Sequence, residues 1–504
     1  MFINKRNLPT IFFLFLWLIP FVIFFKDFFE ISTIKNIFNF KVYRILQNTL
    51  IQSFLSTIVS FIIALIPAYY ISKKENFVSN LLESSLFIPF FFPPISTVVS
   101  FSIILNLPFM KSLNISYSLI AIVIAHSFYN SPIFVKYIGE ALRKIPISIK
   151  EQSQLEGFSK FYLFQKIELP IILPSILRAF FLVFTYSFTS FVIVLSLGNI
   201  KYSTFEVAIV KTLMSSFDFS KAMGFAIIQL VVLGIINYLT SNINDYELEE
   251  QPKGKGKINF WILIGSLIYL IFEYSIIFVG LTASFFDYYK SKFDFSKLVV
   301  IFSQKFNEKF PVIISMRNSI FVGIIVAFLT IAVAYILLKN KSKISNLIIL
   351  SSIGISAAFL AMTLLYLNVL YRVSFPILVI VGQLLIAVPI GYSFMYQHIT
   401  GFDKSIIEAA NLAGANTFKT FINVELPLLK PIFVSTFLQI FAIVYGEFTI
   451  VYTMQMQDYF PLASVVNYQI ASQKLLPESA AFSATNVIII FLLFWIAKRI
   501  KANH

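Results

Sequence analysis

The sequence contains no cysteine and little charge. Only three of its 504 residues are His, and Asp, Glu, Lys and Arg together make up 12%. Without cysteine the chain can form no disulfide, no thiol nucleophile and no Cys-ligated metal site. It also lacks a nucleophile–His–acid set, a cluster of metal ligands and a glycine-rich nucleotide loop. These absences predict that the chain is not an enzyme and binds no metal or cofactor of its own.

Apolar residues are abundant instead, at 58% of the chain with 60 Phe. Runs of roughly twenty apolar residues are long enough to cross a bilayer as helices, and continuous runs exclude the alternating pattern of a membrane barrel. Twelve such runs lie at about 9–26, 48–71, 81–105, 117–138, 171–197, 220–241, 259–284, 315–338, 346–370, 376–398, 428–452 and 481–498. We therefore expect an all-α polytopic membrane protein with about twelve transmembrane helices and both termini in the cytoplasm.

Basic residues outnumber acidic ones by 39 to 24. They collect at the ends of the apolar runs, as they do in the loops of membrane proteins, so the excess predicts contact with the lipid bilayer and not with nucleic acid. Lys5 and Arg6 precede the first apolar run without a small-residue cleavage site after it, which predicts an uncleaved first span. The expected location is the cell (inner or cytoplasmic) membrane, with multiple passes.

Two polar segments, about residues 148–170 and 404–427, interrupt the apolar runs and share one pattern. Each contains a Glu, then a Gly six positions later, then Ile or Val, any residue, Leu and Pro. In the first polar segment these residues are Glu151, Gly157, Ile167, Leu169 and Pro170. In the second polar segment they are Glu408 (followed by Ala409 and Ala410), Gly414, Val424, Leu426 and Pro427, each 257 positions after its counterpart.

The repeat extends through the whole chain. Asn48-Thr49 and Asn318-Ser319 each open a long apolar run, and a charged, Gly-containing stretch separates the two copies. Internal repeats define the unit of a fold, and a polar Gly-containing stretch between copies is typical of a linker. We expect a first transmembrane domain at 1–241, a cytoplasmic linker at 242–257 and a second transmembrane domain at 258–504.

The pattern resembles the EAA signature of the permeases of ABC importers, which reads Glu-Ala-Ala, three residues, Gly, nine residues, then Ile-x-Leu-Pro. The second copy departs only at Val424, whereas the first reads Glu-Gln-Ser at 151–153. Two copies in register are a specific signal. The resemblance implies two tandem homologous six-helix domains, with both polar segments in the cytoplasm acting as coupling segments.

The same resemblance implies the partners. Two copies of a separate cytoplasmic ATPase subunit would bind ATP and Mg and press on the two coupling segments. An external solute-binding protein would deliver the solute, which would cross by alternating access between the two repeats.

A single chain with two fused domains resembles the thiamine and ferric-iron importers. The stretches 187–198 and 204–209 look like the thiamine-type permease, and so does Gly446-Glu447-Phe448, where that family tends to have Gly-Asp-Phe. These matches are weaker than the match of the two polar segments to the EAA signature. They favour thiamine narrowly over ferric iron.

Glu447 and Arg178 are the charged residues that we place within spans. An acid in a span is costly, so Glu447 is expected to line a solute path that favours a cation. Gly446 and Ser190, the residue 257 positions before Glu447, are expected to line the same path. The alternative is a position near the outer interface, or a pairing with a basic neighbour. For His126 the expectation is a satisfied core hydrogen bond and not a proton relay. The prolines at 89, 93 and 94 fit a broken helix near the path and a packing kink equally well.

Two other classes remain as alternatives. A secondary transporter of a small cation would suit two repeats without any ATPase partner, but it has no reason to keep the polar pattern twice. A membrane-embedded enzyme would need a cluster of titratable residues within the spans, which the sequence lacks.

Overall fold

The computed structural model of the chain describes residues 8–29, 40–86, 92–198, 200–241, 259–288, 290–340 and 352–502, together with residues 243, 342, 346 and 349. In this part of the chain ten helices are long and apolar enough to cross a membrane. They confirm an all-α polytopic membrane protein. The only β structure among the described residues is one pair of strands of two residues each. The expected third and ninth spans correspond to two shorter apolar helices, Pro94–Asn106 and Ala357–Tyr371.

The count of twelve spans stays a prediction, as does the cytoplasmic location of the termini. Residues 87–91 and most of 341–351, which lead into the two shorter helices, lie outside the described residues. The helix Pro94–Asn106 has Pro93 as its N-cap and Pro94 in its first turn. Proline at that position loses no helical hydrogen bond, so these two prolines start a helix instead of breaking one. Pro89 lies outside the described residues.

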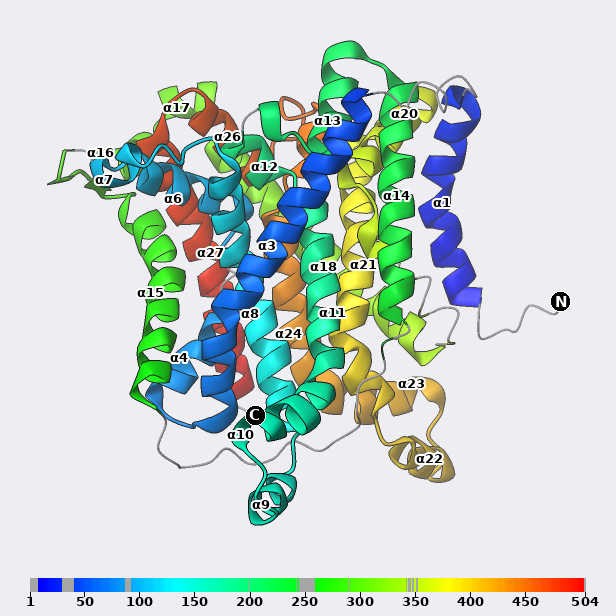
Figure 1. Cartoon of the computed structure of the whole chain (residues 1–504). Helices are drawn as coiled ribbons and strands as arrows, with labels where there is room; N and C mark the ends of the chain where they lie inside the picture. Colours follow the sequence, from blue (N-terminus) through cyan, green and yellow to red (C-terminus); the bar gives the residue numbers. More distant parts are fainter. Residues whose placement is uncertain are drawn as a thin grey trace. The chain divides into compact units, whose positions relative to one another are not determined.

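The described residues form two compact units (Figure 1). The first-repeat unit comprises those within Ser32–Leu298 and Leu476–Ala484. Its elements are α3 (Phe40–Lys73), α4 (Phe77–Ser85), α6 (Pro94–Asn106), α7 (Pro108–Ser112), α8 (Leu119–Arg143), α9 (Ile147–Leu155), α10 (Lys160–Leu163), η2 (Phe164–Glu168), α11 (Leu169–Phe188), α12 (Val192–Leu197), η3 (Ile200–Tyr202), α13 (Phe205–Lys211), η4 (Thr212–Ser216), α14 (Phe219–Ser241), α15 (Phe260–Thr282) and an antiparallel hairpin of β1 (Phe286–Asp287) and β2 (Lys292–Phe293).

The second-repeat unit comprises the described residues within Met1–Ile31, Val299–Leu475 and Thr485–His504. Its elements are α1 (Leu8–Phe28), α17 (Gln304–Lys309), α18 (Val312–Lys339), η5 (Ser352–Gly354), α20 (Ala357–Tyr371), α21 (Phe375–Thr400), α22 (Lys404–Leu412), α23 (Thr417–Thr420), η6 (Phe421–Glu425), α24 (Leu426–Tyr445), α25 (Thr449–Met454) and α26 (Ala463–Ser472). The helices α16 (Ser296–Val300) and α27 (Leu476–Ala502) each have residues in both units.

Each unit contains the opening helix of the other half of the sequence. In the second-repeat unit, the ring of Phe24 on α1 packs edge-on against Phe359 and Tyr366 of α20, and the Tyr366 hydroxyl donates to Asp27 at 2.8 Å. In the first-repeat unit, α15 packs so closely on α6 that a Cβ at Gly280 would lie 2.3 Å from Ser100 Oγ. The expected domain boundary stays a prediction, because the linker 242–257 lies outside the described residues except for Ile243.

Small residues hold the centre of the first-repeat unit together. Ala64 and Ala68 of α3 and Ala179 of α11 are fully buried, and they pack in one cluster with Phe134 and Val135 of α8. Lipid tails are as apolar as the side chains they would replace, so helices in a membrane associate through close packing and not through the hydrophobic effect. Alanines allow that close approach, and they fix α3, α8 and α11 as the frame that carries the first polar segment.

Candidate functional site

The two polar segments fold in the same way, element by element. In the first, α9 is followed by a turn, the short helix α10, the π-helical turn η2 and the long helix α11. In the second, α22, α23, η6 and α24 follow in the same order, and every bound lies 257 positions after its counterpart. Figure 1 shows α9 and α22 projecting beyond the ends of the long helices that follow them. Each segment is therefore a helical hairpin attached to the start of a membrane-spanning helix.

Glycine makes the turn of each hairpin. Gly157 has a φ of +76° and Gly414 a φ of +84°, in the left-handed region that other residues enter at a cost. In each hairpin the N–H one residue later bonds the carbonyl five positions back, at 3.0 Å for Phe158 and 3.1 Å for Ala415. This bond is that of a Schellman motif, in which Gly closes a helix. A Cβ would meet no atom within 4 Å at either position, so backbone conformation and not space requires the glycine.

The Leu-Pro pair at the end of each segment starts the long helix. Pro170 and Pro427 lie in the first turns of α11 and α24, directly after the π turns η2 and η6, and neither residue has an N–H to donate. The preceding N–H groups, of Leu169 and Leu426, bond five residues back to Phe164 and Phe421. Such π turns within helices are uncommon and concentrate at functional sites.

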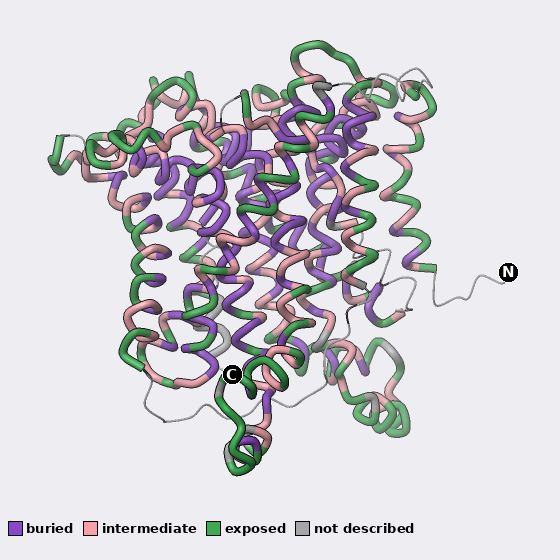
Figure 2. Tube along the Cα trace, viewed as in Figure 1, coloured by how far each residue is buried: buried purple, intermediate pink, exposed green. Residues whose placement is uncertain are grey.

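The hairpins expose the same apolar side chains. Leu155 is 88% exposed and its counterpart Leu412 is 90% exposed, while Phe161 and Phe418 are 73% and 70% exposed. Exposed apolar residues gathered in one place mark surfaces that bind a partner. Figure 2 shows the outer turns of both hairpins as exposed. A surface repeated side chain for side chain in both units is therefore a candidate docking surface.

The remaining residues of the pattern lie on the same hairpins. Glu408, Ala409, Gly414 and Pro427 are exposed, Leu426 is partly exposed, and Ala410 and Val424 are half-buried. In the first hairpin Gly157 and Pro170 are exposed, and Ile167 and Leu169 are half-buried. Glu151 lies on α9, and its side chain is not among those that the structure describes.

The two hairpins differ in how their first helix begins. Asp403 caps α22, and its carboxylate accepts the backbone N–H of Ser405 at 2.9 Å. That bond holds the pKa of Asp403 below its ordinary value. At the equivalent position before α9 the sequence has Pro146, whose side chain cannot accept a hydrogen bond. The second hairpin therefore has a helix cap that the first cannot have at that position.

A buried ion pair attaches the second hairpin to α18. Glu425, which lies between Val424 and Leu426, is 2% exposed, and Lys339 Nζ lies 2.8 Å from its Oε1. The Tyr335 hydroxyl donates to its other oxygen. Tyr335 also packs on Phe421, at 5.4 Å between ring centroids. Asn48 and Asn318 align α3 with α18 at an offset of 270 positions. The equivalents of Tyr335 and Lys339 are then Leu65 and Tyr69, which cannot form this pair.

We expect Lys339→Met to lower the free energy of unfolding by about 1–2 kcal/mol. Removing one partner of a fully buried pair costs about 3–5 kcal/mol, and the partial exposure of Lys339 reduces that penalty. The midpoint of thermal unfolding in detergent measures the change. Lys430→Met, at an exposed position of α24, is the matched control. Equal midpoints for the two variants would contradict the prediction.

The sequence-predicted path residues lie where long helices break. Helix α11 ends at Phe188 and α12 begins at Val192, with Ser190 between them; α24 ends at Tyr445 and α25 begins at Thr449, with Gly446 and Glu447 between. Broken helices at membrane depth expose backbone groups that bind solutes and ions in transporters. Ser190 and Glu447 are half-buried, and Gly446 is buried.

Glu447 is held by neutral partners. Its Oε1 accepts the Ile450 N–H at 3.0 Å, and Gln383 Nε2 of α21 lies 3.5 Å from its Oε2. Within the described part of the chain no Lys or Arg lies within ion-pairing distance of the carboxylate. The alternative of a basic partner therefore finds no support among these residues.

Sequence reasoning missed buried polar residues in the spans, among them Glu273 and Gln383. Glu273 of α15 is fully buried and accepts from Ser131 at 3.0 Å, so placing only Arg178 and Glu447 within spans was wrong. Gln383 was overlooked as well. Both stand alone in long apolar runs, and a scan of those runs for single polar residues would have found them. His126 is only half satisfied: Nδ1 lies 3.0 Å from Ser56 Oγ, and Nε2 has no partner among the described residues.

The duplicated Asn-led motif has a structural role in both units. The amides of Asn48 and Asn318 donate to backbone carbonyls just before α13 and α26, at 2.7 and 3.1 Å. The next residues, Thr49 and Ser319, accept the first N–H groups of those helices at 3.1 and 2.9 Å. These bonds satisfy helix-end groups that would otherwise be unpaired in the membrane. The motif fixes the segment that follows each helix break.

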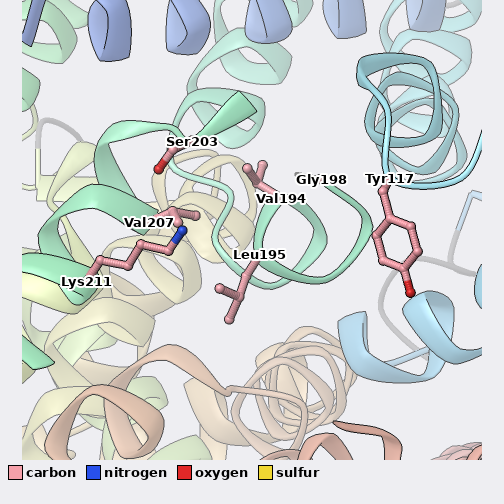
Figure 3. Close-up of a pocket in the computed structure, with 7 residues that line it drawn as sticks. All are labelled: Tyr117, Val194, Leu195, Gly198, Ser203, Val207 and Lys211. Carbon is pink, nitrogen blue, oxygen red and sulfur yellow. The ribbon is translucent and has the colours of Figure 1, made fainter. Parts of the chain in front are cut away.

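A pocket of about 320 Å³ lies between α12, the short helix after the first helix break, and α13. It is lined by Tyr117, Val194, Leu195, Gly198, Ser203, Val207 and Lys211. Figure 3 shows Lys211 and Ser203 on one side of Leu195 and Tyr117 on the other. The volume is at the lower end of the range for small-molecule sites, and a few polar groups on an apolar wall are typical of such sites. Six of these residues, all except Tyr117, lie in the stretches 192–198 and 200–211, which follow α11.

Comparison with known proteins agrees with these features. Residues 60–247 match the family model described as "Binding-protein-dependent transport system inner membrane component". The "Thiamine transport system permease protein ThiP" of Haemophilus influenzae is 32% identical over 169 residues, which cover 32% of this chain and 31% of that protein. The protein of the same name from Escherichia coli is 32% identical over 122 residues, or 24% of this chain and 23% of that protein.

A second kind of relative matches over a longer stretch. The "Putative ferric transport system permease protein FbpB 1" of Haemophilus influenzae is 24% identical over 439 residues, which cover 78% of this chain and 67% of that protein. The similarity to the thiamine permeases thus spans a third of their length or less, whereas the similarity to the ferric permease spans about two thirds.

Proposed function

Because residues 60–247 match the family of binding-protein-dependent transport system inner membrane components, we propose that the chain moves a small solute into the cytoplasm as the permease of an ATP-driven importer. It is a multi-pass protein of the cell inner membrane and a transport component, not an enzyme. ATP and Mg would bind to a separate ATPase subunit, of which two copies act on this chain.

One observation carries the proposal. The two hairpins have the same helix bounds, the same positive-φ glycine and the same exposed pairs, Leu155 with Leu412 and Phe161 with Phe418. A protein that works alone gains nothing from an exposed apolar surface built twice. A pair of identical ATPase subunits would need two equivalent sites, and a short helix laid into a groove is a common mode of recognition.

The mechanism proposed is alternating access. ATP binding would draw the two ATPase subunits together, and each hairpin would pass the movement to the helix that its Leu-Pro pair starts. Such a movement requires the hairpins to bind the ATP-bound and ATP-free states of the ATPase with different affinities. A partner that binds both states equally would not shift the equilibrium between them. An external solute-binding protein would supply the solute to the outward-facing state.

Thiamine is the solute proposed first, and ferric iron second. The relatives named for thiamine are more similar in sequence, and the relative named for ferric transport matches over more of the chain. The helix break supports an organic cation, because it presents one carboxylate and one amide, Glu447 and Gln383, in the described part of the chain. A hard trivalent metal ion prefers several anionic oxygen ligands.

The test is uptake by vesicles that contain this chain, its ATPase and its binding protein. We expect labelled thiamine to accumulate only when ATP is supplied, and labelled ferric iron to remain outside. Accumulation of iron but not of thiamine would reverse the choice of solute and leave the importer proposal intact. Uptake that ignores ATP and follows an ion gradient would overturn the importer proposal in favour of a secondary transporter.

A further inference from the structure

The amide of Gln383 is buried and only partly paired. Gln383 lies on α21 and is 1% exposed, yet its Nε2 is 3.5 Å from Glu447 Oε2, beyond the usual length of an N–H···O bond. Its Oε1 has no hydrogen-bond partner among the described residues. Buried side-chain amides are normally fully bonded, so an amide held this way needs a reason beyond packing.

Glu447 determines which way the amide points. If the oxygen and nitrogen of Gln383 were exchanged, two oxygen atoms would face each other, which is unfavourable. Glu447 Oε1 is occupied by the N–H of Ile450, so its Oε2 is the oxygen turned toward Gln383. The site therefore offers two acceptor oxygens, Glu447 Oε2 and Gln383 Oε1, to a group that can donate.

The first repeat has a polar residue at the same place. His126 lies 257 positions before Gln383, as Ser190 does before Glu447. It is 2% exposed, and its Nε2 has no partner among the described residues. An apolar residue would pack at this position without leaving a polar atom unpaired. Both units carry that unfavourable feature at equivalent positions of the repeat, and in the second-repeat unit the position faces the helix break, which indicates a role in binding.

The backbone around Gln383 is held firmly. A Cβ on the preceding residue, Gly382, would lie 2.8 Å from Leu364 of α20 and 3.3 Å from Ile450 of α25. The glycine lets α21 pack tightly on both helices, so Gln383 and Glu447 keep a fixed separation. A binding pair held in place before the ligand arrives loses less freedom when it binds.

We propose that Gln383 contacts the solute together with Glu447, and that the pair selects an organic cation that carries an N–H donor. The carboxylate accepts a charge-assisted bond from the cation, and the amide oxygen accepts a bond from the N–H group. A cation without such a donor would leave Gln383 Oε1 unpaired, and a site with an unpaired buried polar group rejects that ligand. The inference rests on the proposed transport function and names the chemistry that it selects.

The experiment compares thiamine with an analogue whose pyrimidine amino group is replaced by hydrogen. Both are cations, and only the first has the amino N–H donors. Uptake of each is measured in the ATP-driven vesicles for the wild type and for Gln383→Met, which keeps the side-chain length and removes both polar atoms. Because the binding protein is the same throughout, a change in preference on mutation reports the permease.

We expect Gln383→Met to lower kcat/KM for thiamine about tenfold, the factor for one hydrogen bond of ordinary net strength, and to change that of the analogue less than about twofold. Gln229→Met is the matched control. Gln229 of α14 is also 1% exposed, and its Oε1 also has no partner among the described residues, but its Nε2 makes a 2.7 Å bond to Glu206 of α13 and does not face Glu447. This variant should leave the preference between the two solutes unchanged.

Three results would overturn the proposal. If Gln383→Met lowers the uptake of both solutes by the same factor, Gln383 supports the fold and does not select the solute. If it changes neither, Gln383 does not contact the solute. In both cases the transport function stands. If wild-type vesicles hydrolyse ATP and take up neither solute, the proposed substrate and this inference fail together.

Discussion

Replacing Gly414 by proline is expected to abolish ATP-driven uptake, with a fall of at least about a hundredfold. Proline fixes φ near −65°, whereas Gly414 has a φ of +84° and donates its N–H to Asn411 at 3.0 Å. The turn cannot form with that residue, so α22 would lose its position relative to α24. Gly414 is exposed with no atom near its Cβ position, so the chain should still insert normally. Uptake in vesicles and chain level in the membrane give the two readouts.

Gly414→Asn is the matched control, because Asn tolerates the left-handed region better than other residues that carry a Cβ. It should retain most of the uptake, and Gly414→Ala should lie between the two. Combining Gly414→Pro with Glu408→Lys, which reverses a charge on the exposed face of α22, should leave no uptake. Normal uptake in that double variant would remove the coupling role of the second hairpin.

Replacing Leu155 and Leu412 together by Asp is expected to weaken binding of an ATPase subunit about thirtyfold at each hairpin. Apolar side chains that anchor an interface contribute about 2 kcal/mol or more, which is about thirtyfold in affinity for each. Both leucines are almost fully exposed, so an Asp at either position costs the free chain little. The dissociation constant is measured with the chain in lipid nanodiscs and the purified ATPase.

The matched control for the leucines is Phe293→Asp. Phe293 is 71% exposed on β2 of the first-repeat unit, in the loop after α15, and should not affect the ATPase. Leu155→Asp and Leu412→Asp taken singly compare the two hairpins, which differ in the Asp403 cap and in the Glu425–Lys339 pair. An unchanged dissociation constant in the double variant would show that the exposed leucines are not the docking surface.

The hairpins could be predicted from the sequence because local rules determine them. Gly157 and Gly414 indicate turns, and Pro170 and Pro427 indicate helix starts, whatever surrounds them. The apolar runs likewise predicted spans, since burial in lipid depends on composition. The third and ninth runs, which appear as the shorter helices α6 and α20, show where that rule is weaker: hydropathy does not report where within a run the helix begins.

Contacts between residues far apart in the chain could not be predicted from the sequence. Hydropathy says that α1 and α15 enter the membrane, but not which helices they pack against, because every span presents similar apolar side chains to lipid. The π turns depend on bonds from Leu169 and Leu426 to residues five positions back, a geometry that residue preferences do not specify. The pairing of Gln383 with Glu447 joins two spans 64 positions apart, and only the folded chain brings them together.

The exchange of α1 and α15 between the two units has a consequence for biosynthesis. Phe24 packs on Phe359, which the ribosome adds 335 residues later. At about 5–20 residues per second, α1 enters the membrane on the order of twenty seconds to a minute before its partner helix exists. Folding of the first-repeat unit is also delayed, because this unit includes Leu476–Ala484, which are synthesised long after its other helices. Neither unit can finish folding before its later helices have been synthesised, and the cell must keep α1 from pairing wrongly until then.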